Sequence, residues 1–189
     1  MEMKSVLISI QPKWVEKIAN GEKTIELRKS RPKLETPFKC YIYATKSRDR
    51  IVLKDDRVFE ISKALTGKVI GEFVCNEIEE FHEWELSPQG KFAEFEEERL
   101  KKILSAACLS IAEVVRYREN LPYYKPLYGW HISDLKIYDK PKELSEFFKP
   151  CSQSQNLDCD WLRSNNVCAC SNKKPITRPP QSWCYVEEE

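Results

Sequence analysis

The chain has 189 residues, of which 41% are hydrophobic and 32% are charged, and its formal net charge is +1. This length favours one domain with an appendage, and the near-neutral balance gives no support for nonspecific nucleic-acid binding by charge alone. No apolar stretch approaches the roughly 18 residues of a transmembrane helix, and the first residues lack the layout of a signal peptide. We therefore expect a cytoplasmic protein without a membrane partner.

The charge is unevenly distributed along the chain. Residues 1–50 carry twelve Lys and Arg against six Asp and Glu, whereas residues 72–98 carry ten Glu against a single Lys. A basic N-terminal surface would favour phosphate groups through counterion release. The alternative is a solvated charged surface that has no partner. The basic residues that could border a site are Lys29, Arg31, Lys33, Lys46, Arg48 and Arg50.

A strand and a short helix are predicted near the N-terminus. Residues 4–10 are apolar enough for a strand. Pro12 suits the first turn of a helix, because its missing N–H would have no partner there in any case. Gly21 is predicted to end that helix, since glycine enters the left-handed backbone region at low cost. Trp14 lies on this helix, where it either packs into the core or stacks on a nucleobase.

The strand that follows carries a polar face. Residues 24–27 alternate, so that Thr24 and Glu26 lie on one face and two aliphatic side chains lie on the other. Arg28 continues the polar face, and the glycine turn places Lys23 at the mouth of the strand. These residues could bind a ligand, perform acid–base chemistry, form an internal ion network that only fixes this part of the fold, or simply face solvent.

The middle of the chain is predicted to supply the scaffold. Periodicity and turn residues indicate a strand over 38–46, a charged loop with a short helix over 47–66, a strand over 68–81 bent at Gly71, helices over 94–107 and 110–119, and a strand over 128–138. The 110–119 helix has a capping box, with Ser110 as the cap and Glu113 three residues later. The last strand loses its alternation at Ser133–Asp134, which suggests a bulge or a bend.

Trp130 and His131 must face opposite sides of the last strand. One of them should therefore enter the core, and the other should meet a pocket or the solvent. His131 is either a hydrogen-bonded structural histidine or a pocket group that binds a base or a phosphate. The predicted ligand-binding residues are Trp14, Lys23, Thr24, Glu26, Arg28, Tyr43, Lys46 and His131.

The C-terminal segment holds five of the eight cysteines, and their spacing is not the paired pattern of a zinc ribbon. Disulfides are disfavoured in a reducing compartment, and a four-thiolate zinc site would order this polar segment. Free thiols and disulfides are the alternatives. The predicted zinc ligands are Cys159, Cys168, Cys170 and Cys184, with Cys151 as a spare. The remaining residues, Cys40, Cys75 and Cys108, lie in apolar contexts and are predicted to be core residues. No organic cofactor is expected.

Three stretches together resemble the ASCH domain, which belongs to the PUA-like β-barrels: Ser-Val-Leu-Ile-Ser-Ile, Gln-Pro-x-Trp and Gly-x-Lys-Thr-Ile-Glu-x-Arg. The resemblance is clearest over residues 5–31 and continues through residues 41–45, 67–73 and 128–132. It implies an α+β fold, with a PUA-like (ASCH) β-barrel and flanking helices over residues 1–148. An irregular Cys-rich extension over residues 149–189 would pack on that domain. The tail resembles those of bacterial or phage-borne ASCH proteins.

The resemblance implies RNA or a modified nucleoside as the partner. One bacterial ASCH branch hydrolyses the acyl amide of N4-acetylcytidine with a lysine, a threonine three residues later and a glutamate, and another branch resembles a ribonuclease. Lys23 matches that lysine, but Glu26 stands at the threonine position and Thr24 occupies a different hydroxyl position. No glutamate can be matched, because residues 94–98 offer several candidates.

Two main hypotheses follow. The first is an RNA- or modified-nucleobase-binding domain with a polar pocket at the barrel mouth built on Lys23, Thr24, Glu26 and Arg28. The second is a metal-independent hydrolase that acts on a nucleoside amide or an RNA phosphodiester, with Lys23 and Glu26 as the acid–base pair. A third possibility is an adaptor in which the cysteine tail binds a protein partner.

Overall fold

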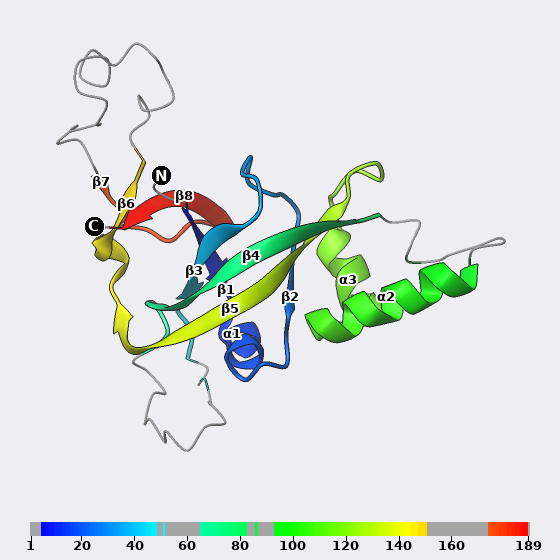
Figure 1. Ribbon diagram of the computed structural model, residues 1–189, viewed down its shortest axis with the longest axis horizontal. Coiled ribbons are helices and arrows are strands. Elements are labelled where there is room, and N and C mark those ends of the chain that lie inside the picture. Colours follow the sequence, from blue (N-terminus) through cyan, green and yellow to red (C-terminus); the bar gives the residue numbers. More distant parts are fainter. Residues whose placement is uncertain are drawn as a thin grey trace, which may run out of the picture.

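The computed structural model describes residues 5–48, 51, 65–82, 86, 93–150 and 174–188. Within these ranges the chain forms one mixed sheet with strand order β2-β5-β4-β3-β1-β8-β6-β7, together with three α-helices (Figure 1). The elements are β1 (Ser5–Ile10), α1 (Pro12–Ala19), β2 (Ile25–Arg28), β3 (Phe38–Ala44), β4 (Val69–Phe81), α2 (Ala93–Ala107), α3 (Ile111–Arg118), β5 (Leu127–Lys142), η2 (Leu144–Glu146), β6 (Phe147–Lys149), β7 (Lys174–Pro175) and β8 (Trp183–Glu188).

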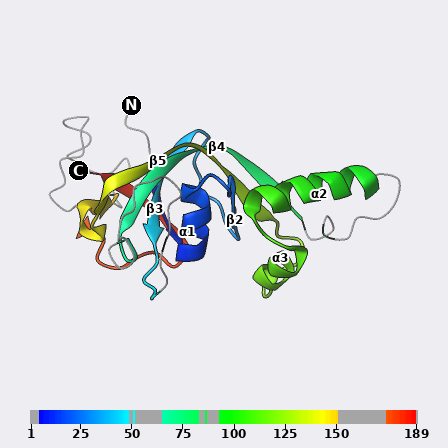
Figure 2. The ribbon, with the colours of Figure 1, turned by 90° about the horizontal axis from the view of Figure 1, so that it is seen from below.

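The predicted α+β class is confirmed, but the backbone ladder is open. Strands β2 and β7 end the sheet, and they do not pair with each other in the part of the chain that the structure describes. The barrel expected from the resemblance is therefore not closed by backbone hydrogen bonds. Helix α1 packs near the middle of the sheet, whereas α2 and α3 lie together at the end that carries β2 (Figures 1 and 2).

Strand β1 is the centre of the fold. Every residue of β1 is buried, because it lies between β3, to which it is parallel, and β8, to which it is antiparallel. Val6, Ile8 and Ile10 join the main hydrophobic core, and Leu7 joins a second core on the opposite face. A largely apolar strand of this kind, in which only Ser5 and Ser9 are polar, is expected where both faces of a sheet are covered.

Helix α1 forms as the sequence predicts. Pro12 occupies its first turn, and Pro12, Val15 and Ile18 are its buried residues. Gly21 follows the helix at a φ of +73°, in the left-handed region that glycine adopts without steric cost. The turn it makes delivers the chain into β2.

Strands β4 and β5 pair along most of their length, with interruptions at the predicted places and a further, unpredicted one between Cys75 and Ile78. The register shifts between Val69 and Gly71, and again where Glu72 and Val74 face β5. Asp134 has a φ of +47°, which confirms the predicted irregularity at Ser133–Asp134. Such bulges bend the two strands and give the sheet its curvature.

The two helices after β4 are also confirmed. The capping box at the start of α3 is present, with the Ser110 side chain accepting from the Glu113 backbone N–H. Cys40 and Cys75 are buried as predicted, but the prediction that Cys108 is a core residue is wrong. Cys108 is only partly buried, because it follows the last turn of α2 with a φ of +53° and donates its Sγ–H to the Glu22 carbonyl.

The end of the chain lies within the same sheet. Strand β8 pairs with β1, with Leu7 opposite Cys184. The division at residues 148 and 149 stays a prediction, and residues 151–173 lie outside the described residues. Among the helices that are described, none is both long and apolar enough to cross a membrane.

Candidate functional site

Lys23, Glu26 and Arg28 form a buried ionic group, which we call the charged cluster. The Lys23 ammonium lies 3.3 Å from one Glu26 carboxylate oxygen, and Arg28 Nη2 lies 3.1 Å from the other. The three side chains are 2%, 8% and 9% exposed. Two positive charges and one negative charge are therefore enclosed together, which leaves an uncompensated positive charge where desolvation makes charge costly.

Lys23 also holds helix α2 against the strand edge. Its ammonium donates a 2.6 Å hydrogen bond to the Ala107 carbonyl, and the Thr24 backbone N–H donates to the Ala106 carbonyl at 2.8 Å. Both carbonyls belong to the last turn of α2, where the helix dipole favours a cation. The ammonium is 5.2 Å from the centre of the Trp14 ring, which places an aromatic face beside the cluster.

The guanidinium of Arg28 has fewer good hydrogen-bond acceptors than it has N–H donors. Its Nη2 donates to the Ser9 carbonyl at 2.7 Å, and Nη1 reaches the Ser182 hydroxyl only at 3.5 Å. Its Nε is buried and has no hydrogen-bond partner. A buried guanidinium normally satisfies its donors, so Arg28 retains donor capacity that the described residues do not use.

Side-chain hydrogen bonds connect β2 and the segment after it to β1 and β8, strands with which β2 forms no backbone ladder. Trp183 Nε1 donates to the Ser30 hydroxyl at 3.0 Å, and the Lys33 backbone N–H donates to the Tyr185 hydroxyl at 2.8 Å. Together with Arg28, these bonds join the segment after β2 to β1 and β8. The charged cluster therefore lies where side-chain hydrogen bonds, and not backbone pairing, hold the β2 segment against β1 and β8.

Tyr117 of α3 lies beside the charged cluster. Burial raises the pKa of its phenol, and the charges of Arg28 and Glu26 act on it in opposite directions. Its ring also lies 5.0 Å from the ammonium of Lys29, which follows β2 directly. The surroundings of the cluster are therefore cationic and aromatic on the side of α3.

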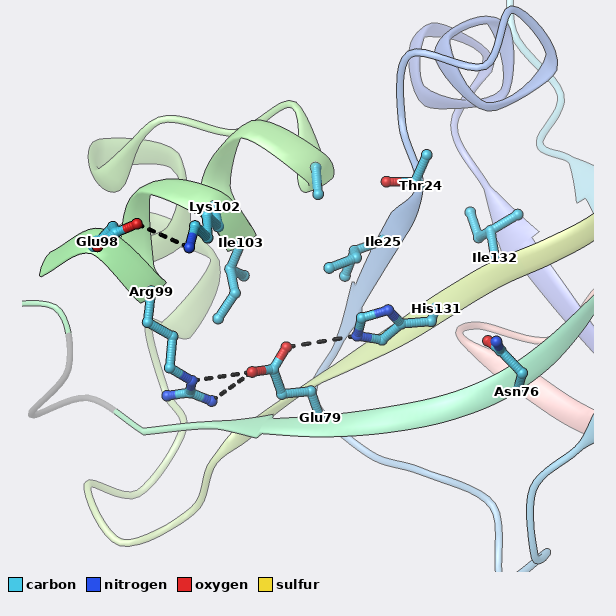
Figure 3. Close-up of a pocket in the computed structure, with 11 residues that line it drawn as sticks. Thr24, Ile25, Asn76, Glu79, Glu98, Arg99, Lys102, Ile103, His131 and Ile132 are labelled. Carbon is cyan, nitrogen blue, oxygen red and sulfur yellow. Dashed lines mark hydrogen bonds and ion pairs between the residues drawn. The ribbon is translucent and has the colours of Figure 1, made fainter. Parts of the chain in front are cut away.

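A separate cavity lies on the other side of β2, between α2 and the sheet (Figure 3). We call it the α2 cavity; its volume is about 490 Å³. The Glu79 carboxylate lies in it between Arg99 and His131. It accepts hydrogen bonds from Arg99 Nη2 at 2.8 Å and from Arg99 Nε at 3.0 Å, and it lies 3.5 Å from His131 Nε2. The lining residues are Thr24, Ile25, Asn76, Glu79, Glu98, Arg99, Lys102, Ile103, Ala106, His131 and Ile132.

The predicted site residues are divided between these two places. Lys23, Glu26 and Arg28 come together as expected, with Trp14 beside them, whereas Thr24 and His131 line the α2 cavity. Strand β2 separates the two groups because Ile25 faces α2 while Glu26 faces the opposite side. The single polar face proposed for Thr24, Glu26 and Arg28 is thus corrected for Thr24, which lies before the first residue of β2.

Of the remaining predicted residues, Tyr43 and Lys46 lie apart from both places, and the expected opposition of Trp130 and His131 can be checked directly. Trp130 is fully buried in the core and its neighbour His131 faces the α2 cavity, which confirms that the two face opposite sides. Tyr43 packs in the second core, among residues that do not belong to either place. Lys46 is exposed and packs against Gly67. Neither residue contacts the charged cluster in the described interactions.

The predicted zinc ligands are mostly beyond what the structure describes. Cys159, Cys168 and Cys170 lie outside the described residues. Cys184 is in β8, partly buried against the second core, and burial raises the pKa of its thiol to about 11. The described residues contain no group of three or more side chains able to hold a metal ion.

Some residues of both places were not predicted. Glu79 and Arg99 belong to a region with many charged residues, and the sequence gives no reason to choose one glutamate over another as a cavity residue. The carbonyls of Ser9 and Ala107 carry no sequence signal, because any residue could supply them. The one available signal was the predicted end of the helix at residue 107, because the carbonyls at a helix C-terminus attract cations such as Lys23.

Comparison with known families settles the family. The sequence pattern of the ASCH domain matches residues 8–124, more than half of the chain. The chain belongs to the ASCH domain family. Such domains have a PUA-like fold, which supports a nucleic-acid-binding role in general terms. The bacterial or phage-borne type remains a prediction.

One solved structure supports this fold, and two further matches are more distant. An ASCH protein from Zymomonas mobilis is 18% identical with a TM-score of 0.50, covering 98% of this chain and 90% of that one. A mutant of that protein is 17% identical with a TM-score of 0.48, covering 98% and 89%. The N-terminal domain of McrB from Staphylothermus marinus is 13% identical with a TM-score of 0.40, covering 93% and 88%, which is too remote to support a functional argument. The comparison with curated proteins finds no significant match.

Proposed function

We propose that this ASCH domain binds RNA or a modified nucleobase, with the charged cluster as the recognition site. The observation that carries the proposal is the composition of the cluster: two cations and one carboxylate, each more than nine-tenths buried. A ligand with a carbonyl or phosphate oxygen would supply the acceptor that Arg28 Nε lacks and would offset the excess positive charge. Nucleobases and nucleotides carry both kinds of oxygen.

The surroundings support a nucleic-acid ligand rather than a simple anion. Trp14 is half-buried beside the cluster, and the exposed Lys13 lies 4.2 Å from the centre of its ring. A base that stacks on Trp14 would displace the Lys13 ammonium, which would then lie close enough to the ligand to contact a neighbouring phosphate. The segment after β2 adds the exposed side chains of Lys29, Arg31 and Lys33.

The experiment compares basic residues near the cluster with basic residues elsewhere. We would measure the affinity for short single-stranded RNA at several salt concentrations in a double variant, Arg31→Gln with Lys33→Gln. A matched double variant, Lys101→Gln with Lys140→Gln, removes the same charge from α2 and β5. All four side chains are exposed, so both variants should fold.

The first variant should bind more weakly and lose about 0.7 from the salt slope for each phosphate contact removed. The matched variant should behave like the native chain. Equal weakening in both would mean that charge anywhere on the surface contributes, and the proposal would then fail.

A hydrolase is the second candidate, and one distance favours it. The Lys23 ammonium and the Glu26 carboxylate are 3.3 Å apart, which suits an acid–base pair. The same ammonium is already bonded to Ala107, so this chemistry would have to share a structural contact. A panel of nucleosides and short RNAs, followed by mass spectrometry, tests it. A product that the native chain makes and a folded Glu26→Gln variant does not would establish the hydrolase.

A further inference from the structure

Two adjacent tyrosines are unusually exposed at the end that carries α3. Tyr123 is 65% exposed and Tyr124 is 74% exposed, the highest values among the large hydrophobic residues that the structure describes. They lie in the loop of residues 119–126 between α3 and β5, which projects from the same end of the molecule as α2 and α3 (Figures 1 and 2). Because the two tyrosines are adjacent, they form a contiguous exposed aromatic surface, and such surfaces can mark binding sites.

The loop that carries these tyrosines is held from inside by Arg118. This side chain is 5% exposed and donates to the Lys125 carbonyl at 3.0 Å and to the Tyr123 carbonyl at 3.4 Å. The Lys125 backbone N–H donates in turn to the Pro122 carbonyl at 2.9 Å. A buried arginine thus fixes the backbone from which the two rings project. The loop backbone is therefore held in place before a ligand binds, which lowers the entropic cost of binding.

Contacts connect this loop to the charged cluster. Lys29, next to Arg28 in the chain, donates to the Glu119 carbonyl at 3.1 Å, and Glu119 begins the loop. The same ammonium lies 5.0 Å from the centre of the Tyr117 ring. A ligand that leaves the cluster past Lys29 would therefore meet a basic and aromatic surface that leads to Tyr123 and Tyr124.

We propose that Tyr123 and Tyr124 form a stacking platform for unpaired bases of a single-stranded RNA, of which another nucleotide occupies the charged cluster. This inference rests on the proposed function and makes it narrower: the ligand is a polymer, not a free nucleoside. Aromatic side chains stack on any base, and the ammonium groups of Lys29 and Lys125 would meet the phosphates between. The surface would add affinity without adding much sequence preference.

The experiment compares a long ligand with a short one. We would measure the affinity of the full chain for a mixed-sequence RNA octamer and for the four nucleoside monophosphates. The test variant is Tyr123→Ala with Tyr124→Ala. The conservative variant, Tyr123→Phe with Tyr124→Phe, keeps the ring faces. A third variant, Ile111→Ser with Val115→Ser, removes two other exposed apolar side chains that cannot stack.

The alanine variant should bind the octamer at least about fivefold more weakly for each lost stack, and it should bind monophosphates as the native chain does. The phenylalanine and serine variants should each stay within about twofold of the native chain. Octamer binding that is unchanged in the alanine variant would overturn the platform while leaving the proposed function intact. A failure of the native chain to bind any of these ligands would overturn both. Weakening by the serine variant equal to that by the alanine variant would mean that RNA binding depends on exposed apolar surface in general and not on stacking, and it would overturn the platform.

Discussion

Replacing Glu26 with Gln should strongly destabilise the fold, independently of any effect on ligands. Glu26 lies 3.3 Å from Lys23 and 3.1 Å from Arg28. At an effective dielectric of about 20, each attraction is worth about 5 kcal/mol before desolvation is counted. Much of that is offset by the cost of burying the charges. Removing one member of a buried ionic group nevertheless typically costs about 3–5 kcal/mol, because the remaining charges stay buried without compensation.

Urea unfolding followed by circular dichroism measures this effect. A loss of about 3–5 kcal/mol would be a large part of the 5–15 kcal/mol that typically stabilises a domain. Glu35→Gln is the matched control, because Glu35 is exposed and its replacement should stay within about 0.5 kcal/mol. If Glu26→Gln cost less than about 1 kcal/mol, the carboxylate would not be what stabilises the two cations. The description of a buried ionic group would then be wrong.

Three further predictions concern the scaffold and the tail. Gly71→Ala should cost about 1–3 kcal/mol or more, because its Cβ would lie 2.4 Å from a backbone oxygen of β5, whereas Gly21→Ala, which meets no atom, should cost only the strain of its positive φ; unfolding of the two variants compares them. Burial alone would raise the pKa of Glu72, but a tyrosine hydroxyl and a lysine ammonium lower it overall. The ionised carboxylate therefore stabilises the fold fully above its unfolded pKa, and this contribution is lost as the pH falls through its folded pKa. In Glu72→Gln, the free energy of unfolding should consequently fall less steeply at acid pH than in the native chain. If Cys184 is a zinc ligand, Cys184→Ser should lower the zinc content of the purified chain, and metal analysis that finds equal zinc would remove it from the ligand set.

Sequence reasoning worked best within single elements. Pro12 and Gly21 bounded α1, the capping box located the start of α3, and alternation placed Trp130 and His131 on opposite faces. Each of these depends on residues a few positions apart, where backbone geometry fixes the outcome. The same reasoning located the charged cluster, because Glu26 and Arg28 lie two residues apart in one strand.

Reasoning failed where distant segments meet. Lys23 donates a hydrogen bond to the carbonyl of Ala107, which is 84 residues away in the sequence, and no local pattern predicts that contact. Alternation also failed one residue before β2, where Thr24 turns to the α2 cavity instead of the cluster. Exposed tyrosines in the loop after α3 were missed because a sequence does not show which aromatic residues the core leaves outside.

The most direct test of the central claim observes Arg28 itself. Its Nε–H has no acceptor among the described residues, and Arg118 has a buried Nε–H in the same condition, which makes it an internal control. We would record the arginine Nε–H signals by NMR, assign the first from Arg28→Lys, and add nucleoside monophosphates. The account predicts a saturable shift of the Arg28 signal with the Arg118 signal unchanged. A ligand that binds and leaves the Arg28 signal in place would show that recognition occurs elsewhere and would contradict the account.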